Sequence, residues 1–214
     1  MIQPEPHDFS WEHYENLFPA RYIHTGQFDQ EILKVIEDIK PWAALDIGGG
    51  KYGTKALRDV FRVFLLDPFI KHMPFWMDGR FNWDEIGRDQ NGETFHLVVL
   101  RGSINYLSAE QLKIAASATD RALIANTFLE EPQEYRERPY ETIHGDEGLE
   151  ITRYDPSTQT VTHILKPSKS PRDCPDEIVH QFYYRSPEWF QSILPGVEII
   201  PRGKSATLIW KPNR

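Results

Sequence analysis

A glycine-rich turn and two acidic residues form the part of this sequence best suited to hold a ligand. The stretch Leu45–Gly53 (LDIGGGKYG) lies at the end of an apolar run, and Asp67 ends the next apolar run along the chain. Glycine suits a turn between a strand and a helix, where the chain bends sharply and a ligand comes close to the backbone. In an open parallel sheet the second strand end lies beside this turn, so a carboxylate at Asp67 can accept hydrogen bonds from both hydroxyls of a ribose. The sequence therefore predicts a nucleoside site.

Asp46 separates two classes of nucleoside ligand. Gly48, Gly50 and Gly53 match the glycine spacing of dinucleotide-binding turns, which alone is a weak signal. Nicotinamide enzymes usually have an apolar strand end here, because the pyrophosphate lies at a helix N-terminus, and a carboxylate at Asp46 would oppose that pyrophosphate. The same carboxylate suits the cationic aminopropyl end of S-adenosylmethionine, directly or through water. A tight turn without a ligand is the alternative interpretation, and it leaves Asp46 and Asp67 unexplained.

With these motifs the sequence resembles the class I S-adenosylmethionine-dependent methyltransferases, of the type that acts on small molecules. The segments that carry the resemblance are Leu45–Gly50, Leu65–Pro68 and Phe95–Val99, within residues 29–128 and 186–211. The resemblance implies an α/β fold with a Rossmann-like, seven-stranded, mostly parallel sheet, helices on both faces and an antiparallel last strand. The sequence departs from the family pattern at Tyr52, where many members have a third small residue, and at His96, where an aspartate is frequent.

The hydrophobic pattern predicts the elements that would position this site. Apolar runs alternate with helical periodicity across residues 29–128, which is typical of a parallel sheet covered on both faces. The expected strands are 43–47, 63–66, 74–77, 96–100 and 122–126, and the expected helices are 29–39, 54–60 and 108–119, the last with Ser108 and Gln111 as a capping box. Period-two alternation then predicts an antiparallel insertion with a hairpin at 149–154 and 160–165 and a further strand at 178–184. A helix at 186–194 and a closing pair at 197–200 and 206–210 complete the chain.

We interpret the 214 residues as a single methyltransferase-like domain with four parts. The parts are an N-terminal cap (1–28), a cofactor-binding core (29–128), an antiparallel β lid or substrate insertion (129–185) and a C-terminal helix and β-hairpin (186–214).

The candidate cofactor-binding residues come from four segments of the core. They are Asp46, Gly48, Gly49 and Gly50 in the first turn; Asp67 and Pro68 after the second strand; Asp78, Phe81, Asn82 and Trp83 as an adenine-contacting loop; and Arg101, Gly102 and Ser103 after the fourth strand. The resemblance implies that the glycines line the methionine end of S-adenosylmethionine and that Asp67 holds the ribose.

The chemistry to be served is in-line displacement at a carbon activated by a sulfonium, which leaves S-adenosylhomocysteine as product. The protein must align the reactants and can also supply a base. The candidate catalytic residues are His163, His180 and Tyr106, and the candidate substrate-binding residues are Arg21, Tyr22, His144, Tyr183 and Tyr184. For each histidine a surface or packing role is the alternative. The spacing of His144, His163 and His180 matches no tight metal-ligand pattern, so we expect no metal.

Composition limits the partners. The formal net charge of −8 and the lack of a basic patch disfavour nucleic acid and anionic lipid, so we expect a small-molecule acceptor. The single cysteine, Cys174, cannot form an intramolecular disulfide, which fits a reducing compartment. The sequence shows neither a signal peptide nor a run of about 20 apolar residues. We therefore expect a cytoplasmic protein without membrane contact. A homodimer is left open. An NAD(P)-dependent oxidoreductase and a protein that binds S-adenosylmethionine without methylating are the alternative functions.

Overall fold

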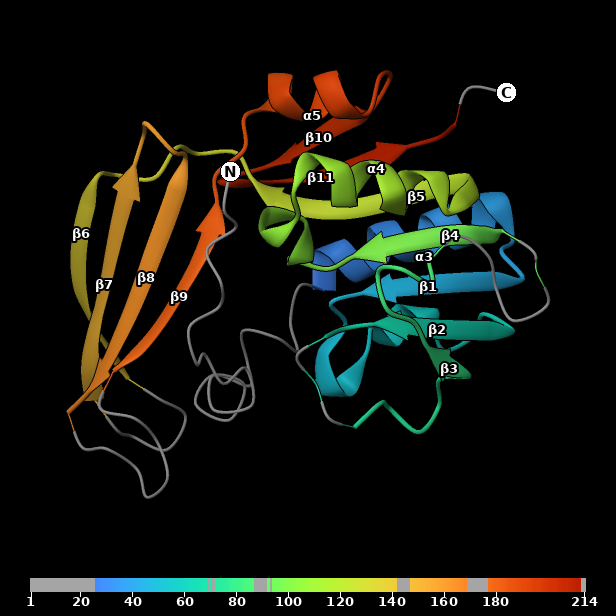
Figure 1. Ribbon diagram of the computed structural model, residues 1–214, viewed down its shortest axis with the longest axis horizontal. Helices are drawn as coiled ribbons and strands as arrows, with labels where there is room; N and C mark the ends of the chain where they lie inside the picture. The colour runs from blue at the N-terminus through green and yellow to red at the C-terminus, as the bar shows by residue number, and fades with distance from the viewer. Residues whose placement is uncertain are drawn as a thin grey trace. The chain divides into compact units, whose positions relative to one another are not determined.

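The glycine-rich turn follows strand β1 of a seven-stranded sheet, in a computed structural model that describes residues 26–68, 70, 72–86, 92, 94–141, 147–168 and 177–212. Along the sheet the strand order is β10-β11-β5-β4-β1-β2-β3. The strands are β1 (Ala43–Ile47), β2 (Arg62–Leu66), β3 (Gly79–Arg80), β4 (Phe95–Leu100), β5 (Thr119–Phe128), β10 (Glu198–Arg202) and β11 (Ser205–Trp210). Strands β1 to β5 are mutually parallel, and β11 pairs antiparallel with both β5 and β10 (Figure 1). The predicted Rossmann-like, mostly parallel sheet is therefore confirmed.

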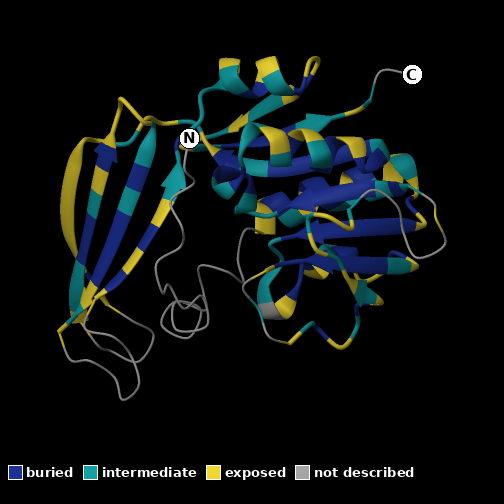
Figure 2. Ribbon diagram, in the orientation of Figure 1, coloured by how far each residue is buried: buried dark blue, intermediate teal, exposed yellow. Residues whose placement is uncertain are grey.

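Helices cover both faces of this sheet, as the continuous apolar runs predict. Helix α3 (Gly26–Ile39) packs Phe28, Ile32 and Val35 into the core on one face. Helices α4 (Ala109–Ser117) and α5 (Pro187–Ile193) pack on the other face. Strands buried on both faces must be apolar throughout, and the central strands are buried along nearly their whole length (Figure 2).

The predicted helix starts agree with the structure where a side chain caps the helix. Ser108 accepts a hydrogen bond from the Gln111 backbone at 3.1 Å and its own N–H donates to the Gln111 side chain at 3.0 Å, which is the expected capping box of α4. Ser186 caps α5, with Pro187 in the first turn. Both signals are local, so they could be recognised without tertiary information.

Two of the expected elements differ. The helix expected over 54–60 is reduced to the three-residue 3-10 turn η2 (Lys55–Leu57). A second 3-10 turn, η1 (Gly50–Tyr52), precedes it and is separated from it by Gly53, at a φ of +63°, and the extended Thr54. The strand expected at 74–77 is absent, and the two-residue strand β3 lies just after it. The apolar side chain of Met77 belongs to the core without being in a strand.

The chain folds into two compact units: a larger one, Gly26–Glu130 with Arg185–Arg214, and a smaller one, Met1–Thr25 with Glu131–Tyr184. The larger unit contains the seven-stranded sheet. The described part of the smaller unit is an antiparallel sheet in the order β6-β7-β8-β9, formed by β6 (Tyr135–Glu141), β7 (Glu147–Asp155), β8 (Thr160–Pro167) and β9 (Ile178–Tyr183). The predicted antiparallel insertion is confirmed.

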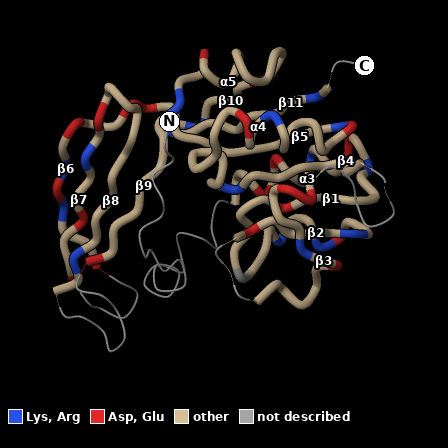
Figure 3. The backbone as a smooth tube through the Cα atoms, viewed as in Figure 1, with Lys and Arg blue, Asp and Glu red and all other residues tan. Residues whose placement is uncertain are grey.

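Strand β6 was not predicted. It is an edge strand whose residues are exposed except for Tyr140, and acidic and basic side chains alternate along it (Figure 3). Pro139 is tolerated there because an edge strand has one unpaired side. Edge strands need charge rather than an apolar face, so the usual alternation is missing from the sequence. Within the described ranges no helix combines the length and apolar character needed to cross a membrane.

Candidate functional site

The glycine turn after β1 is closed by contacts that leave no room for side chains. Gly48 has a φ of +73°, and a Cβ atom on it would lie 2.5 Å from the Cβ of Ser103. A Cβ atom on Gly49 would overlap the carboxylate of Asp46. The turn is also tied to the neighbouring strand, since the Gly48 N–H donates to the Leu66 carbonyl at 2.8 Å. A side chain at Gly48 would therefore collide with Ser103, and one at Gly49 with Asp46, so glycine is needed at both positions.

Asp46 is fully buried beneath this turn. Its Oδ2 accepts a hydrogen bond from the Thr54 backbone N–H at 2.7 Å, and its Oδ1 accepts one from the Thr54 hydroxyl at 3.0 Å. Burial raises the pKa of Asp46 to about 6. The negative charge of Asp67 raises this pKa further, whereas the hydrogen bonds from Thr54 and the positive charge of Arg101 lower it. The carboxylate therefore holds the glycine turn in place through Thr54.

Asp67 lies at the carboxyl end of β2 and beside the glycine turn, which is the position that the sequence predicts for it. Its side chain is 6% exposed, and its Oδ2 accepts a hydrogen bond from the Gly50 backbone N–H at 3.0 Å. A carboxylate has two oxygens and about four lone-pair positions, so it can accept further hydrogen bonds from a ligand. The adjacent Pro68 is exposed at the same strand end.

The loop after β4 forms the third part of the site. Ser103 donates its hydroxyl to the Ile47 carbonyl, which places this loop against the end of β1. Two side chains from the end of β5 hold it as well: Asn126 Oδ1 accepts from the Gly102 N–H at 2.6 Å, and the Thr127 hydroxyl donates to Asn105 Oδ1 at 2.8 Å.

Arg101 and Tyr106 lie at the two ends of this loop. Arg101 forms an ion pair with Asp29 in the first turn of α3, which ties the loop to that helix. Tyr106 ends the 3-10 turn η3 (Ser103–Tyr106) and is partly buried. The turn, Asp67 and this loop thus meet at the carboxyl edge of β2, β1 and β4.

The predicted adenine-contacting residues divide into two groups. Asp78 pairs with Val63 near the start of β2, where its Oδ2 accepts from the Val63 N–H at 2.7 Å, so the structure does not bring it to the strand end that carries Asp67. Phe81, Asn82 and Trp83 follow β3 toward the carboxyl edge, and Phe81 contacts the rings of Phe64 and Phe95. Asn82 is bonded to Glu85, through its backbone at 2.9 Å and its side chain at 3.0 Å, and Trp83 packs on the core.

The two candidate histidines lie in the smaller unit, in a row of polar side chains that crosses its sheet from the exposed Arg138 to the buried His180. Arg138 on β6 donates two hydrogen bonds of 2.8 Å to Glu150 on β7, and Glu150 Oε1 lies 2.8 Å from His163 Nε2 on β8. His163 Nδ1 lies 3.4 Å from His180 Nε2 on β9. Glu150, His163 and His180 are each less than 9% exposed. Glu150, His163 and His180 thus lie in buried contact across β7, β8 and β9.

The remaining candidates are the predicted substrate-binding residues. Tyr184 is buried against Tyr154, with ring centroids 5.9 Å apart, and Tyr183 next to it ends β9. Arg21, Tyr22 and His144 lie outside the described residues. Across the described ranges no three His, Cys, Asp or Glu side chains are arranged to hold a metal ion.

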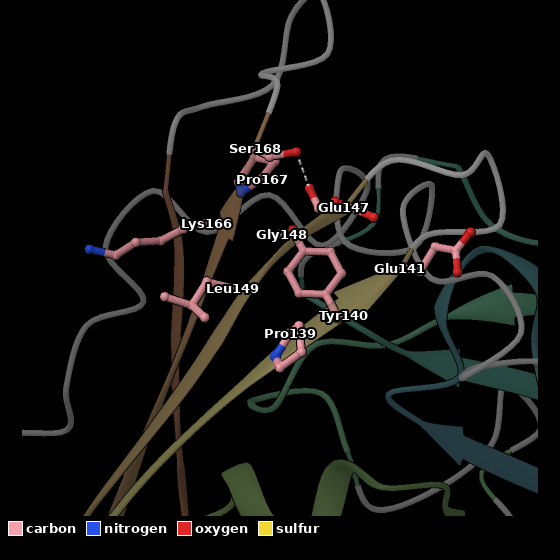
Figure 4. A pocket seen from close by; sticks show the side chains of 9 residues that line it. All are labelled: Pro139, Tyr140, Glu141, Glu147, Gly148, Leu149, Lys166, Pro167 and Ser168. Carbon is pink, nitrogen blue, oxygen red and sulfur yellow. Dashed lines mark hydrogen bonds between the residues drawn. The ribbon is translucent and has the colours of Figure 1, made fainter.

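A hollow at one end of the smaller sheet contains no predicted site residue (Figure 4). Its lining consists of Pro139, Tyr140, Glu141, Glu147, Gly148, Leu149, Lys166, Pro167 and Ser168. The ring of Tyr140 covers Gly148, where a side chain would collide with it, and the Ser168 hydroxyl donates to the Glu147 carbonyl at 2.6 Å. Packing between neighbouring strands explains these contacts.

The sequence did not reveal several residues whose contacts hold the glycine turn, the loop after Asp67 and the loop after β4 in place. Thr54 was expected only at the start of the helix over 54–60, and Arg80 and Asn126 were not predicted to have a role. Arg80 on β3 donates to the carbonyls of Asp67 at 2.5 Å and Ile70 at 2.9 Å. Arg80 and Asn126 reach their partners only because neighbouring strands pair, and no local motif marks these contacts.

Comparison with known proteins gives matches among solved structures. No protein-family model and no curated protein matches the sequence. An S-adenosylmethionine-dependent methyltransferase from Clostridium acetobutylicum is 11% identical, with a TM-score of 0.70 over 95% of this chain and 98% of that chain. The CcbJ methyltransferase from Streptomyces caelestis is 11% identical, with a TM-score of 0.66 over 90% of this chain and 98% of that one.

An amino pentose methyltransferase from Micromonospora echinaspora, solved with S-adenosylmethionine bound, is also 11% identical, with a TM-score of 0.63 over 96% of this chain and 98% of that chain. At such identities the similarity concerns the fold. The chain therefore has the fold of the class I S-adenosylmethionine-dependent methyltransferases.

Proposed function

We propose that this protein is an S-adenosylmethionine-dependent methyltransferase that acts on a small-molecule acceptor. The observation that carries the proposal is the carboxylate of Asp67, held against the glycine turn by the Gly50 N–H at the carboxyl edge of the sheet. Ligands of open α/β sheets bind at this edge. The fold shared with the solved methyltransferases supports the same assignment.

The residues at this edge fit an adenosine with a positively charged tail. Asp67 would accept the ribose hydroxyls, and the backbone of Gly48–Gly50 would face the methionine part. Asp46 and Asp67 make the site negative, which favours a cationic ligand. When bound, S-adenosylmethionine supplies a methyl group made electrophilic by its sulfonium. The loop after β4 would border the acceptor, and Tyr106 in that loop is a candidate for the base that takes the acceptor's proton. His163 and His180, in the smaller unit, stay predictions as bases.

The same geometry disfavours a dinucleotide. A pyrophosphate is normally held by the free N–H groups at the start of a helix that follows the glycine turn. Here the turn leads into η1 and η2, which are three residues each, and the Gly50 N–H is already bonded to Asp67. The carboxylate of Asp46, buried beneath the turn, would also oppose the charge of a pyrophosphate. These contacts favour S-adenosylmethionine over NAD(P).

Calorimetric titration with S-adenosylmethionine, S-adenosylhomocysteine, NADH and NADPH tests the proposal. We expect the first two to bind and Asp67→Asn to weaken both by about tenfold or more, since a bidentate acceptor of hydroxyls would be lost. Asp59→Asn is the control, because Asp59 is exposed. Binding of a nicotinamide cofactor alone, or unchanged affinity in Asp67→Asn, would refute the assignment.

A protein that binds S-adenosylmethionine without methylating would pass this titration. Mass spectrometry separates the two functions. We expect S-adenosylhomocysteine and a methylated metabolite when the protein and S-adenosylmethionine are incubated with a cell metabolite extract. The amino pentose methyltransferase among the structural neighbours makes amino sugars a reasonable first set of acceptors.

A further inference from the structure

The backbone that carries Asp67 is held by an unusual partner, the side chain of Arg80. After a strand of a parallel sheet, the chain normally enters a helix, in which backbone N–H groups and carbonyls bond to one another. Between β2 and β3 the described residues form no helix. The carbonyls of Asp67 and Ile70 instead accept hydrogen bonds from Nη2 and Nη1 of Arg80, at 2.5 and 2.9 Å.

Arg80 reaches this loop because of the strand register. It lies opposite Leu65 in the β2–β3 pair, two residues before Asp67. The planar guanidinium presents several N–H donors in a fixed arrangement, so one side chain can fix two carbonyls three residues apart. A lysine ammonium is a single centre at the end of a flexible chain and would hold the pair less well.

Asp67 is thereby fixed from two sides. The Gly50 N–H binds its carboxylate, and Arg80 binds its carbonyl. Arg80 also leads directly into Phe81, whose N–H donates to the Leu65 carbonyl at 2.8 Å, and then into the predicted adenine segment with Asn82. This segment is thus held to β2 by a backbone bond of its own, and the Arg80 side chain acts on the loop that carries Asp67.

We propose that Arg80 is a positioning residue for the adenosine half of the cofactor, acting by holding the loop that aims the Asp67 carboxylate. This inference rests on the proposed function, namely that S-adenosylmethionine binds at this edge. It predicts that Arg80 contributes to affinity only through Asp67. It also predicts equal contributions for S-adenosylmethionine and S-adenosylhomocysteine, because the two share the adenosine half.

A double-mutant cycle tests the inference, with calorimetric affinities for both ligands measured on wild type, Arg80→Met, Asp67→Asn and the double variant. We expect Arg80→Met to weaken both ligands by about tenfold and the double variant to bind no more weakly than Asp67→Asn alone. Arg80→Lys should recover part of the loss. Arg58→Met is the matched control, since Arg58 is an exposed arginine of the same unit that lies over the ring of Trp76.

The outcomes distinguish this inference from the proposed function. If wild type binds S-adenosylmethionine but Arg80→Met binds it within twofold of wild type, the inference is wrong and the proposed function stands. Losses that simply add in the double variant would also overturn it, because they would show an effect independent of Asp67. If wild type binds neither ligand, the proposed function fails and the inference fails with it. The melting temperature of each variant is measured as well, so that affinities are compared only at temperatures where every variant is folded.

Discussion

Thr54 donates both its backbone N–H and its hydroxyl to the carboxylate of Asp46, at 2.7 and 3.0 Å. Both residues are fully buried. The pair closes the chain back onto β1 within eight residues and leaves Gly49 packed on the carboxylate. The shape of the glycine turn therefore depends on a buried acid and one threonine.

Replacing Thr54 by valine removes the hydroxyl but keeps the shape and the backbone N–H. We expect the free energy of unfolding to fall by about 1–3 kcal/mol, because Asp46 Oδ1 would be left buried without its hydroxyl donor. Thr54→Ser keeps the hydroxyl and should retain most of the stability. Chemical denaturation of the two variants measures the difference, and equal losses would show that the hydroxyl is not the stabilising group.

The ionisation of Asp46 makes stability depend on pH. Its pKa is about 6 in the folded chain against 3.8 in the unfolded one, so folding favours the protonated form. The stabilisation is fully present below pH 3.8 and is lost as pH rises through 6, and it amounts to about 1 kcal/mol between pH 5 and pH 7. Asp46→Asn cannot titrate. We expect its unfolding free energy, followed by denaturant titration at several pH values, to lack this decline, and a wild-type and variant pair with parallel pH profiles would contradict the prediction.

Gly48→Ala should destabilise the larger unit in two ways. The new Cβ would lie 2.5 Å from the Cβ of Ser103, and a φ of +73° is unfavourable for alanine. We expect a loss of about 2–4 kcal/mol, of which about 1 kcal/mol comes from the backbone. Gly196→Ala isolates the backbone part, because Gly196 has a φ of +81° and no atom within 4 Å of the added Cβ. Similar melting temperatures for the two variants would mean that the contact with Ser103 relaxes at little cost.

Glu150→Gln tests the polar chain of the smaller unit. The substitution keeps the size of the side chain but removes the negative charge that faces Arg138 and His163. We expect a loss of about 1–3 kcal/mol, since hydrogen bonds to a buried carboxylate would be weakened. Hydrogen exchange should show faster opening of β7 and β8 and unchanged protection of β1 and β4. Glu141→Gln, at an exposed position of β6, is the control. Equal rates of amide exchange in the two variants would argue against a stabilising role for the row of polar side chains around Glu150.

The sequence by itself determined the parallel sheet, the antiparallel insertion and the place of the glycine turn and Asp67 at strand ends. Continuous apolar runs such as 122–125 identify strands buried on both faces, because burial constrains each residue wherever its partners lie. Asp67 and the glycine turn follow directly from the strand ends. The cap at Ser108 was also predictable, since its partner Gln111 is three residues away.

Only the tertiary structure decided which groups these residues contact. The carboxylate of Asp46 is bonded to Thr54, a contact across the turn that the residue types alone do not reveal. Asp78 pairs with the start of β2, and Arg80 reaches the loop after its end, through a strand register that residue types do not encode. Strand β6 escaped prediction because an exposed edge strand is stabilised by backbone pairing, which no apolar pattern reveals.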